Sequence, residues 1–329
     1  MKPDFVEMLV CPKCHRSLRP PGGPDPGADI QSGELKCTEG HTFPIVGGIP
    51  RFVDSELYVQ NFGFEWNVHA DTQLDNSASD ESERTFRSKT GFTPELLRGK
   101  RVLDVGCGMG RFSDVASRWG AIVVGIDLSQ AVEAAQRNIG SRPNVHIAQA
   151  NVFELPFEDG TFDFIFSIGV LHHTPNTKAA FDNLPKLLRD KGKIAIWLYT
   201  SYGGIQWRFS DLYRRVTPRL PQRVLHTVSY ASVPLYYVYK VPILGFFLRW
   251  VLPVSNHPKR QWRVLDTFDW YSPRYQWKHT YEEVFPWFEE HGLTDIRVLG
   301  VPVAVQGTKR PEAHPIAAPT ESTATTITQ

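Results

Sequence analysis

Three cysteines and one histidine near the N-terminus have the spacing of a metal site. Cys11 and Cys14 form a Cys-x2-Cys pair, and Cys37 and His41 follow as Cys-x3-His. Thiolate sulfur and imidazole nitrogen are ligands that Zn²⁺ prefers, and four protein ligands leave no open position for a substrate. The spacing therefore predicts a structural zinc site, whose metal supplies folding energy to a small domain. The alternative is three unrelated buried thiols and a surface histidine.

A glycine-rich stretch at 103–112 has the pattern of a cofactor loop. It ends a predicted strand, begins a predicted helix and reads Gly-x-Gly-x-Gly, with Arg111 in the place of the third glycine of a dinucleotide fingerprint. Glycines let the backbone turn sharply and approach a ligand closely. Asp127 follows 17 residues after Gly110, where a carboxylate can accept hydrogen bonds from two ribose hydroxyls. The alternative role of Asp104 and Asp127 is the capping of a loop or helix.

Two adjacent histidines are the candidates for catalytic proton transfer. His172 and His173 follow the predicted fourth strand, at the edge of an open α/β sheet where ligands bind. Histidine suits proton removal at neutral pH, so either side chain could be a general base, with packing or cofactor contact as the alternative. Cys107 lies inside the glycine loop, and no motif places a histidine or asparagine to activate it. We therefore do not expect a cysteine nucleophile.

Four further polar residues precede the last predicted helix. They could face the same pocket, or they could belong to a surface loop. These residues are Tyr271, Tyr275, Lys278 and His279.

Alternating strand and helix patterns between 99 and 200 must position these groups. Strands that alternate with helices are typical of βαβ units, which build a parallel sheet covered on both faces. We therefore expect an α/β fold with a doubly wound, mostly parallel, Rossmann-like sheet. The predicted strands lie at 101–106, 121–127, 145–148, 162–170 and 193–200, and the predicted helices at 111–119, 129–139 and 177–190.

The C-terminal part predicts the completion of that sheet. Thr280 and Glu283 match a capping box, and apolar residues follow at helical spacing. Pro286 inside this stretch predicts a kink or a late start of the helix. Two short strands near 294–300 and 302–306 would bring the sheet to seven strands.

The stretch 99–200 resembles class I S-adenosylmethionine-dependent methyltransferases of type 11. The resemblance rests on the glycine loop, on Asp127 and Asn151, on Leu-Pro-Phe at 155–157 and on Ser-Ile-Gly-Val-Leu-His-His at 167–173. It implies that the glycine loop holds the methionine part of the cofactor and that Asp127 binds the ribose. Asn151, which is an aspartate in many members, would contact the adenine together with its neighbour.

The same resemblance extends to an N-terminal lid and implies a full set of cofactor-binding residues. Segment 62–67, Phe-Gly-Phe-Glu-Trp-Asn, is similar to a lid in which Trp66 closes over the cofactor, with ordinary packing of an aromatic stripe as the alternative. The implied set is Asp104, Gly106, Cys107, Gly108, Gly110, Asp127, Leu128, Asn151, Val152, Ser167 and Trp66.

The N-terminal segment resembles the small zinc-ribbon proteins that partner RNA and protein methyltransferases. The similar stretches are Leu-Val-Cys-Pro-Lys-Cys at 9–14, Leu-Lys-Cys at 35–37 and Phe-Pro-Ile-Val-Gly-Gly-Ile-Pro at 43–50. Those proteins carry a second Cys-x2-Cys where this chain has Cys37 and His41. The Cys3His version is similar to the ribbon at the front of bacterial rRNA guanine-N1 methyltransferases.

The formal net charge of +1 hides a strongly basic segment. Residues 201–263 contain ten lysines and arginines and a single acid, Asp211, so this segment carries +9 and the rest of the chain −8. Basic residues beside aromatic and aliphatic ones suit a membrane interface or a cap over a lipophilic anionic substrate. RNA is a less favoured partner, and a solvated basic face over a helical subdomain is the remaining alternative.

These observations predict a multidomain enzyme. We expect a methyltransferase (a transferase) that uses S-adenosyl-L-methionine and Zn²⁺ and acts on a small-molecule, glycan or lipid-linked acceptor. An rRNA base methyltransferase and a non-catalytic partner protein are the alternatives. The four cysteines and the lack of a signal-like or 18-residue apolar run favour a cytoplasmic protein without a transmembrane span, with peripheral membrane contact left open.

The expected divisions are a zinc ribbon (1–53), a linker and lid (54–98), a cofactor-binding core (99–200), a basic aromatic insertion (201–279), the last core helix and strands (280–310) and a disordered tail (311–329).

Overall fold

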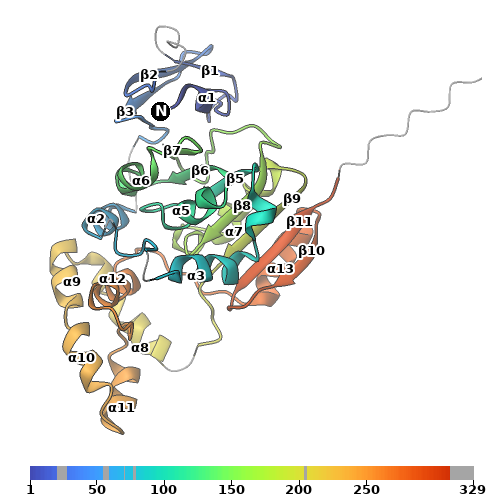
Figure 1. Cartoon of the computed structure of the whole chain (residues 1–329). Coiled ribbons are helices and arrows are strands. Elements are labelled where there is room, and N and C mark those ends of the chain that lie inside the picture. The colour runs from blue at the N-terminus through green and yellow to red at the C-terminus, as the bar shows by residue number, and fades with distance from the viewer. Residues whose placement is uncertain (21–27, 55–58, 70, 77–78, 204–205, 312–329) are drawn as a thin grey trace, which may run out of the picture.

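The structure is a computed structural model with a small N-terminal sheet, a central sheet and a protruding group of helices (Figure 1). It describes residues 1–20, 28–54, 59–69, 71–76, 79–203 and 206–311. The tail that we predict at 311–329 therefore lies outside the described residues, apart from its first residue.

A four-stranded antiparallel sheet forms the N-terminal unit, which is dark blue in Figure 1. Residues in its two longer strands alternate between buried and exposed, as in a sheet with one face against a core. After the short helix α1 (Pro3–Val6) the strands pair in chain order: β1 (Leu18–Arg19), β2 (Ser32–Cys37), β3 (Thr42–Val46) and β4 (Ile49–Pro50).

The central sheet has seven strands in the order β10-β11-β9-β8-β5-β6-β7. Strands β5 to β9 are parallel, and β11 pairs antiparallel with both β9 and β10. This topology confirms the predicted α/β fold with a mostly parallel, doubly wound sheet. The bounds are β5 (Arg101–Val105), β6 (Ile122–Asp127), β7 (Val145–Gln149), β8 (Phe162–Ile168), β9 (Leu188–Trp197), β10 (Leu293–Val298) and β11 (Ala304–Lys309).

The order of the strands determines where a ligand can bind. From β5 the chain adds β6 and β7 on one side, then returns to add β8 and β9 on the other. The loops after β5 and β8 therefore leave the sheet in opposite directions. In an open α/β sheet this divergence leaves a crevice at the carboxyl ends of the strands.

Helices cover both faces of the central sheet, each over its own apolar cluster. On one face, α3 (Glu81–Thr90), α5 (Arg111–Arg118) and α6 (Ala131–Ile139) contribute Phe86, Val115 and Val132 to one cluster. On the other face, α7 (Thr177–Asp182) and α13 (Tyr281–Glu290) contribute to a second cluster, which also contains residues of the N-terminal unit. Short helix α4 (Pro94–Leu97) precedes β5.

Two helix predictions need correction. The predicted helix at 177–190 ends at Asp182, and after a short 3-10 turn the residues from Leu188 onward already belong to β9. The last helix does not start late: its capping box forms, with Thr280 accepting from the Glu283 amide and the Glu283 carboxylate accepting from the Thr280 amide. These two hydrogen bonds satisfy amide groups at the start of α13, and the helix continues through Pro286.

The insertion is helical, and we call residues 206–271 the arm. Figure 1 shows the arm extending away from the central sheet, with α11 at its far end. Within the described ranges no helix is long and apolar enough to cross a membrane. The arm contains α8 (Gln206–Tyr213), α9 (Gln222–Ser229), α10 (Ser232–Val238), α11 (Leu244–Val251) and α12 (Arg260–Tyr271), and α12 contacts α2 (Gln60–Val68).

The N-terminal unit docks on the β7 edge of the central sheet. Lys2 Nζ donates hydrogen bonds to the carbonyls of Gly140 and Val145 at 2.9 and 2.7 Å, and Phe5 stacks on His146 with ring centroids 4.8 Å apart. Apolar residues of both units share one buried cluster. Folding of the small unit is therefore coupled to the edge of the sheet that carries the loop after β7.

Candidate functional site

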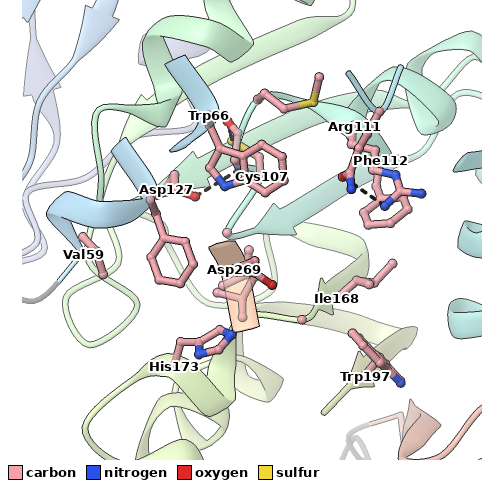
Figure 2. Close-up of a pocket in the computed structure, with 18 of the residues that line it drawn as sticks. Val59, Trp66, Cys107, Arg111, Phe112, Asp127, Ile168, His173, Trp197 and Asp269 are labelled. Atoms are coloured by element: carbon pink, nitrogen blue, oxygen red, sulfur yellow. Dashed lines mark hydrogen bonds between the residues drawn. The ribbon is translucent and has the colours of Figure 1, made fainter. Parts of the chain in front are cut away.

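A cavity of about 440 Å³ lies at the carboxyl ends of the central strands. Its walls come from the loops after β5, β6, β7 and β8, from α2 and α3, and from α12 of the arm. Figure 2 shows side chains from these distant segments around one space. The size falls within the range of small-molecule sites, about 300–1,000 Å³.

The glycine loop forms one wall of the cavity and requires its glycines. Gly106 has a φ of 81°, and a Cβ there would lie 2.3 Å from a methyl carbon of Val170. Gly108 has a φ of 54°, and a Cβ there would come within 3.3 Å of the Trp66 indole nitrogen. The two glycines therefore let Val170 and Trp66 pack directly against the backbone of the loop, in a conformation that other residues disfavour.

Asp127 lies at the end of β6 and faces the cavity from beneath the loop. Its Oδ2 accepts from the Gly108 amide at 3.0 Å, and its Oδ1 accepts from the amide and hydroxyl of Ser129, both at 2.8 Å. Burial raises the pKa of Asp127, and these hydrogen bonds oppose that rise. Because a carboxylate has about four lone-pair sites, Oδ2 retains capacity for a ligand hydroxyl.

Three of the predicted cofactor residues lie behind the cavity instead of lining it. Asp104 is 2% exposed and accepts a hydrogen bond from the Ser113 hydroxyl at 2.7 Å, which ties β5 to α5. The Ser167 hydroxyl donates to the Val105 carbonyl at 2.9 Å and joins β8 to β5. Gly110 is the N-cap of α5 in a left-handed conformation. The geometry gives these residues positioning roles.

The remaining predicted cofactor residues line the cavity. Gly106, Cys107 and Gly108 do so from the loop after β5, and Leu128, Asn151 and Val152 from the next two loops. Trp66 projects from α2 towards Cys107, as Figure 2 shows. Burial, together with the nearby acids Asp104 and Asp127, raises the pKa of Cys107 well above that of a free thiol. This environment disfavours a thiolate nucleophile, as we expect from the sequence.

The two adjacent histidines occupy different environments. His173 lines the cavity, and its Nδ1–H donates to the Tyr275 carbonyl at 2.8 Å, which leaves Nε2 as an acceptor. Its Nε2 has no hydrogen-bond partner among the described residues. Burial lowers the pKa of His173 to about 4, so the ring is neutral at physiological pH. His172 lies behind the cavity, where its ring packs 4.0 Å from that of Tyr199.

The opposite end of the cavity contains ionisable residues that the sequence analysis did not find. They come from α3, from the first residue of α5 and from α12, which lie far apart in the chain and all line the cavity. Lys89 Nζ lies 3.2 Å from the centroid of the Trp197 ring, and burial lowers its pKa to about 7. The Arg111 guanidinium lies 4.9 Å from the Trp262 ring centroid. This end therefore combines cationic groups with aromatic walls.

Two carboxyl groups of α12 complete this end of the cavity. Asp266 and Asp269 are three residues apart and therefore share one face of the helix. Burial raises the pKa of Asp266 to about 7 and that of Asp269 to about 6. The Tyr199 hydroxyl donates to Asp269 Oδ2 at 3.1 Å, and the Arg214 charge also favours the ionised form of Asp269. Asp269 can therefore be ionised at neutral pH while it faces the cavity.

The four polar residues before the last helix do not line this cavity. The Tyr271 hydroxyl donates to the Pro253 carbonyl, Lys278 pairs with Asp211, and His279 contacts Thr177 and Glu283, whereas the Tyr275 carbonyl receives the hydrogen bond of His173. A usable sequence pattern lies slightly upstream. No aspartate or glutamate occurs from 212 to 265, and Asp266 and Asp269 then follow at helical spacing with the two tryptophans at 262 and 270.

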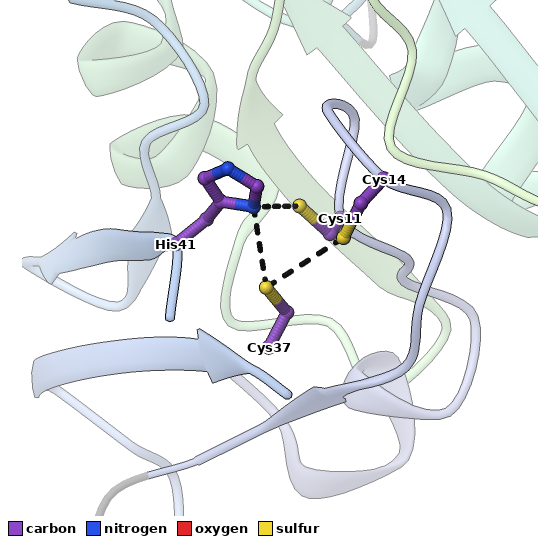
Figure 3. A group of neighbouring side chains, drawn as sticks. All are labelled: Cys11, Cys14, Cys37 and His41. Atoms are coloured by element: carbon purple, nitrogen blue, oxygen red, sulfur yellow. Dashed lines mark hydrogen bonds between the residues drawn. The ribbon is translucent and has the colours of Figure 1, made fainter. Parts of the chain in front are cut away.

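The predicted zinc ligands converge in the N-terminal unit (Figure 3). Their ligand atoms all lie within 4.8 Å of one another. The Sγ atoms of Cys14 and Cys37 are 3.7 Å apart, and His41 Nδ1 lies 3.5 Å from Cys11 Sγ and 3.4 Å from Cys37 Sγ. Tetrahedral Zn²⁺ with the usual bond lengths of about 2.3 Å to sulfur and 2.0–2.1 Å to nitrogen requires edges of about 3.5–3.8 Å. The three distances match such edges, and the four ligand atoms lie close enough together to surround one zinc ion.

Comparisons with known proteins agree with both units. Residues 103–196 match the family model of a methyltransferase domain, and residues 2–48 match that of a Trm112p-like protein. The chain is 27% identical over 179 residues to 24-methylenesterol C-methyltransferase 2 of Oryza sativa subsp. japonica, covering 52% of this chain and 47% of that protein. It is 34% identical over 157 residues to phosphoethanolamine N-methyltransferase 2 of Caenorhabditis elegans, covering 45% of this chain and 34% of that protein.

These matches are partial. The chain spans less than half the length of the two curated relatives. A solved structure of Haemonchus contortus phosphoethanolamine N-methyltransferase 2 in complex with S-adenosyl-L-methionine is 18% identical, covers 78% of this chain and 47% of that chain, and has a TM-score of 0.43. The fold assignment rests on the strand order of the central sheet.

Proposed function

We propose that this chain, in which a methyltransferase domain follows a Trm112p-like ribbon, is an S-adenosylmethionine-dependent methyltransferase that acts on a small-molecule acceptor. The observation that carries the proposal is the continuity of the cavity. One end is the glycine loop with Asp127, and the other end is an aromatic and ionisable chamber built by α3 and α12. A two-substrate transfer requires such adjacent compartments.

The residues of the first compartment suit the cofactor. When bound, S-adenosylmethionine supplies an electrophilic methyl group on sulfur. In our proposal the loop backbone at Gly106 and Gly108 lies against its methionine part, and Asp127 accepts a hydrogen bond from its ribose. Asn151 and Val152 flank the adenine, and Trp66 covers the loop from α2. In the ribbon, a zinc ion would be structural, since four protein ligands close its coordination.

The chamber at the other end indicates the chemistry of the acceptor. Its tryptophan rings, Trp197, Trp262 and Trp270, suit a ring-shaped or apolar face, and its carboxyl groups suit hydroxyl or amino donors. The names of the two curated relatives point to small-molecule acceptors in both cases. Small-molecule acceptors, including glycans and lipid-linked ones, therefore fit the chamber better than an RNA base.

Asp269 is our candidate for the group that accepts the proton of the acceptor. General bases work best when their pKa lies near the operating pH. The pKa of Asp269 is about 6, whereas that of His173 is about 4, so the carboxylate is the stronger base. In the proposed roles Asp269 takes the proton of a hydroxyl or ammonium group, and the neutral His173 Nε2 accepts a hydrogen bond that orients the acceptor.

Two measurements test the proposal. Calorimetry with S-adenosylmethionine and its demethylated product should show binding of both, and failure to bind either would refute the assignment. Incubation with methyl-labelled cofactor and fractionated cell extract should then place the label in the small-molecule or lipid pool. Label confined to RNA would instead support the base methyltransferase alternative, and binding without any transfer would support a non-catalytic role.

A further inference from the structure

The arm contains most of the exposed large apolar side chains among the described residues. Of the twenty large apolar side chains that are exposed among the described residues, fourteen lie between Leu212 and Leu252. Ile243, Phe246 and Phe247 are 77%, 59% and 62% exposed. Exposure of such a patch usually marks an interaction surface. We define the apolar tip as Val241, Ile243, Leu244, Phe246, Phe247, Trp250, Val251 and Leu252.

The backbone of the apolar tip is held in place by hydrogen bonds from neighbouring helices. The Tyr213 hydroxyl donates to the Val251 carbonyl at 2.8 Å, and the Tyr239 hydroxyl donates to the Leu252 carbonyl. The Arg249 guanidinium donates to the Tyr239 carbonyl at 3.0 Å. The two tyrosine contacts satisfy carbonyl groups at the end of α11 that no later helical turn can satisfy, and the Arg249 contact ties α11 to the C-cap of α10. The apolar side chains therefore project outwards from a fixed backbone.

The charges of the chain segment that carries the apolar tip have one sign. No aspartate or glutamate occurs from residue 212 to residue 265, whereas the arm carries most of the basic residues behind the +9 of the segment. Lys240 and Arg249 lie beside the tip itself, with the Lys240 ammonium 4.3 Å from the Tyr236 ring centroid. Arg215, Arg219 and Arg223 are exposed along the arm. A partner that buries this surface must therefore be apolar and carry negative charge at its boundary.

We propose that the apolar tip inserts into the interfacial layer of an anionic lipid bilayer. Helix α11 has only eight residues, so it can lie in the interface but cannot cross the hydrocarbon core. Aromatic and aliphatic side chains bury in the headgroup and acyl boundary, and the flanking cations pair with anionic lipids. Single-stranded RNA fits less well, because it uses stacking on aromatic rings, and Ile243, Leu244 and Val251 offer none.

The proposal is independent of the proposed catalytic function. It concerns a surface at the far end of the arm, away from the cofactor loop (Figure 1). Binding to vesicles can therefore be measured without any acceptor and without turnover.

Co-sedimentation of the full-length chain with vesicles tests the proposal. The vesicles contain phosphatidylcholine alone, or phosphatidylcholine with 30% phosphatidylglycerol. We expect binding to the anionic vesicles and at least tenfold weaker binding to the neutral ones. The double variant Phe246→Glu/Phe247→Glu should bind anionic vesicles at least tenfold more weakly than the unmodified chain. Lys240→Gln should weaken anionic binding to a smaller extent.

Matched variants separate the apolar tip from general surface effects. Val298→Glu changes an apolar side chain of similar exposure (53%) on β10, and Lys186→Gln removes an exposed cation outside the arm; neither should alter vesicle binding. Circular dichroism must show that the double variant is folded. Three outcomes would overturn the proposal: no binding to anionic vesicles, equal binding by the folded double variant, or a change from dimer to monomer in that variant, which would identify the tip as a self-association surface.

Discussion

At the scale of single residues, Asp269 should control how the rate depends on pH. Its pKa of about 6 means that kcat should rise as the pH increases through 6, because only the ionised carboxylate accepts a proton. Asp269→Asn should lower kcat about 100-fold or more, as loss of a general base does, and leave cofactor affinity within about twofold. A pH–rate profile with a labelled-methyl assay measures both effects. The control variant Asp266→Asn, on the same helix face, should keep the rise of kcat near pH 6. If Asp269→Asn also kept this rise, the assignment of Asp269 as the base would be contradicted.

Asp127 should act on cofactor affinity instead of the rate of the chemical step. A hydrogen bond to a charged group contributes about 1.5–3 kcal/mol, so Asp127→Ala should weaken binding of S-adenosylmethionine by about 10- to 100-fold. Isothermal titration calorimetry measures this loss, with circular dichroism as the check that the variant folds. Asp159→Ala removes an exposed carboxylate and should leave the affinity unchanged. Unchanged affinity in a folded Asp127→Ala protein would rule out the ribose contact.

At the scale of elements, the ribbon and the cofactor site should respond together to loss of the metal. Arg51 donates to the Gln149 side chain and pairs with Glu133, and the Phe52 amide donates to the Gln149 carbonyl at 2.8 Å. Gln149 is the last residue of β7, directly before the loop with Asn151. We therefore expect a change in the ribbon to reach the proposed adenine contacts through Gln149.

Cys37→Ser tests this coupling. We expect the variant to lose bound zinc and to bind S-adenosylmethionine more weakly. It should also unfold at a temperature at least about 10 °C lower, because zinc binding contributes roughly 10 kcal/mol or more and each kcal/mol shifts Tm by about 1–2 °C in a chain of this length. Elemental analysis, thermal melting and calorimetry measure the three effects. Cys107→Ser makes the same chemical change outside the quartet and should retain the metal. A Cys37→Ser protein with full zinc content would refute the ligand assignment.

The elements also show what could be predicted from the sequence. Strands β5 to β8 are buried on both faces, so their nearly continuous apolar runs identify them. The cofactor end was predictable because its residues lie directly after those strands. The acceptor end was not, because Lys89 and Asp266 are brought together only by the packing of α3 and α12 around the cavity. Helical periodicity indicates that each helix has a buried face, but not which other element that face meets.

At the scale of the whole molecule, buried acids and buried histidines make opposing contributions to stability. Burial raises the pKa values of Glu65 and Asp104, so the folded state holds protons that the unfolded state has released, and stability falls as the pH rises above about 4.5. Burial lowers the pKa values of His146 and His173 to about 4, so their contribution increases as the pH rises from 4 to 6.5. We therefore expect a shallow dependence of stability on pH between 4.5 and 6.5.

Substitution of the buried Glu65 should reveal how this acid contributes to the pH dependence of stability. Glu65 is 0% exposed, and neither of its carboxyl oxygens has a hydrogen-bond partner among the described residues. Burial and the nearby Asp269 and Asp266 raise its pKa well above the usual range. The Glu65→Gln variant cannot ionise at this position, so its Tm should match that of the unmodified chain at pH 4.5 and exceed it at pH 8. The difference should be about 1–2 °C for each kcal/mol of relieved charge burial in a chain of this length. Thermal melts at both pH values measure the difference. Glu158→Gln, an exposed counterpart, should show none. An equal Tm difference at the two pH values would mean that Glu65 does not titrate with folding, because a group with the same pKa in both states cannot make stability depend on pH.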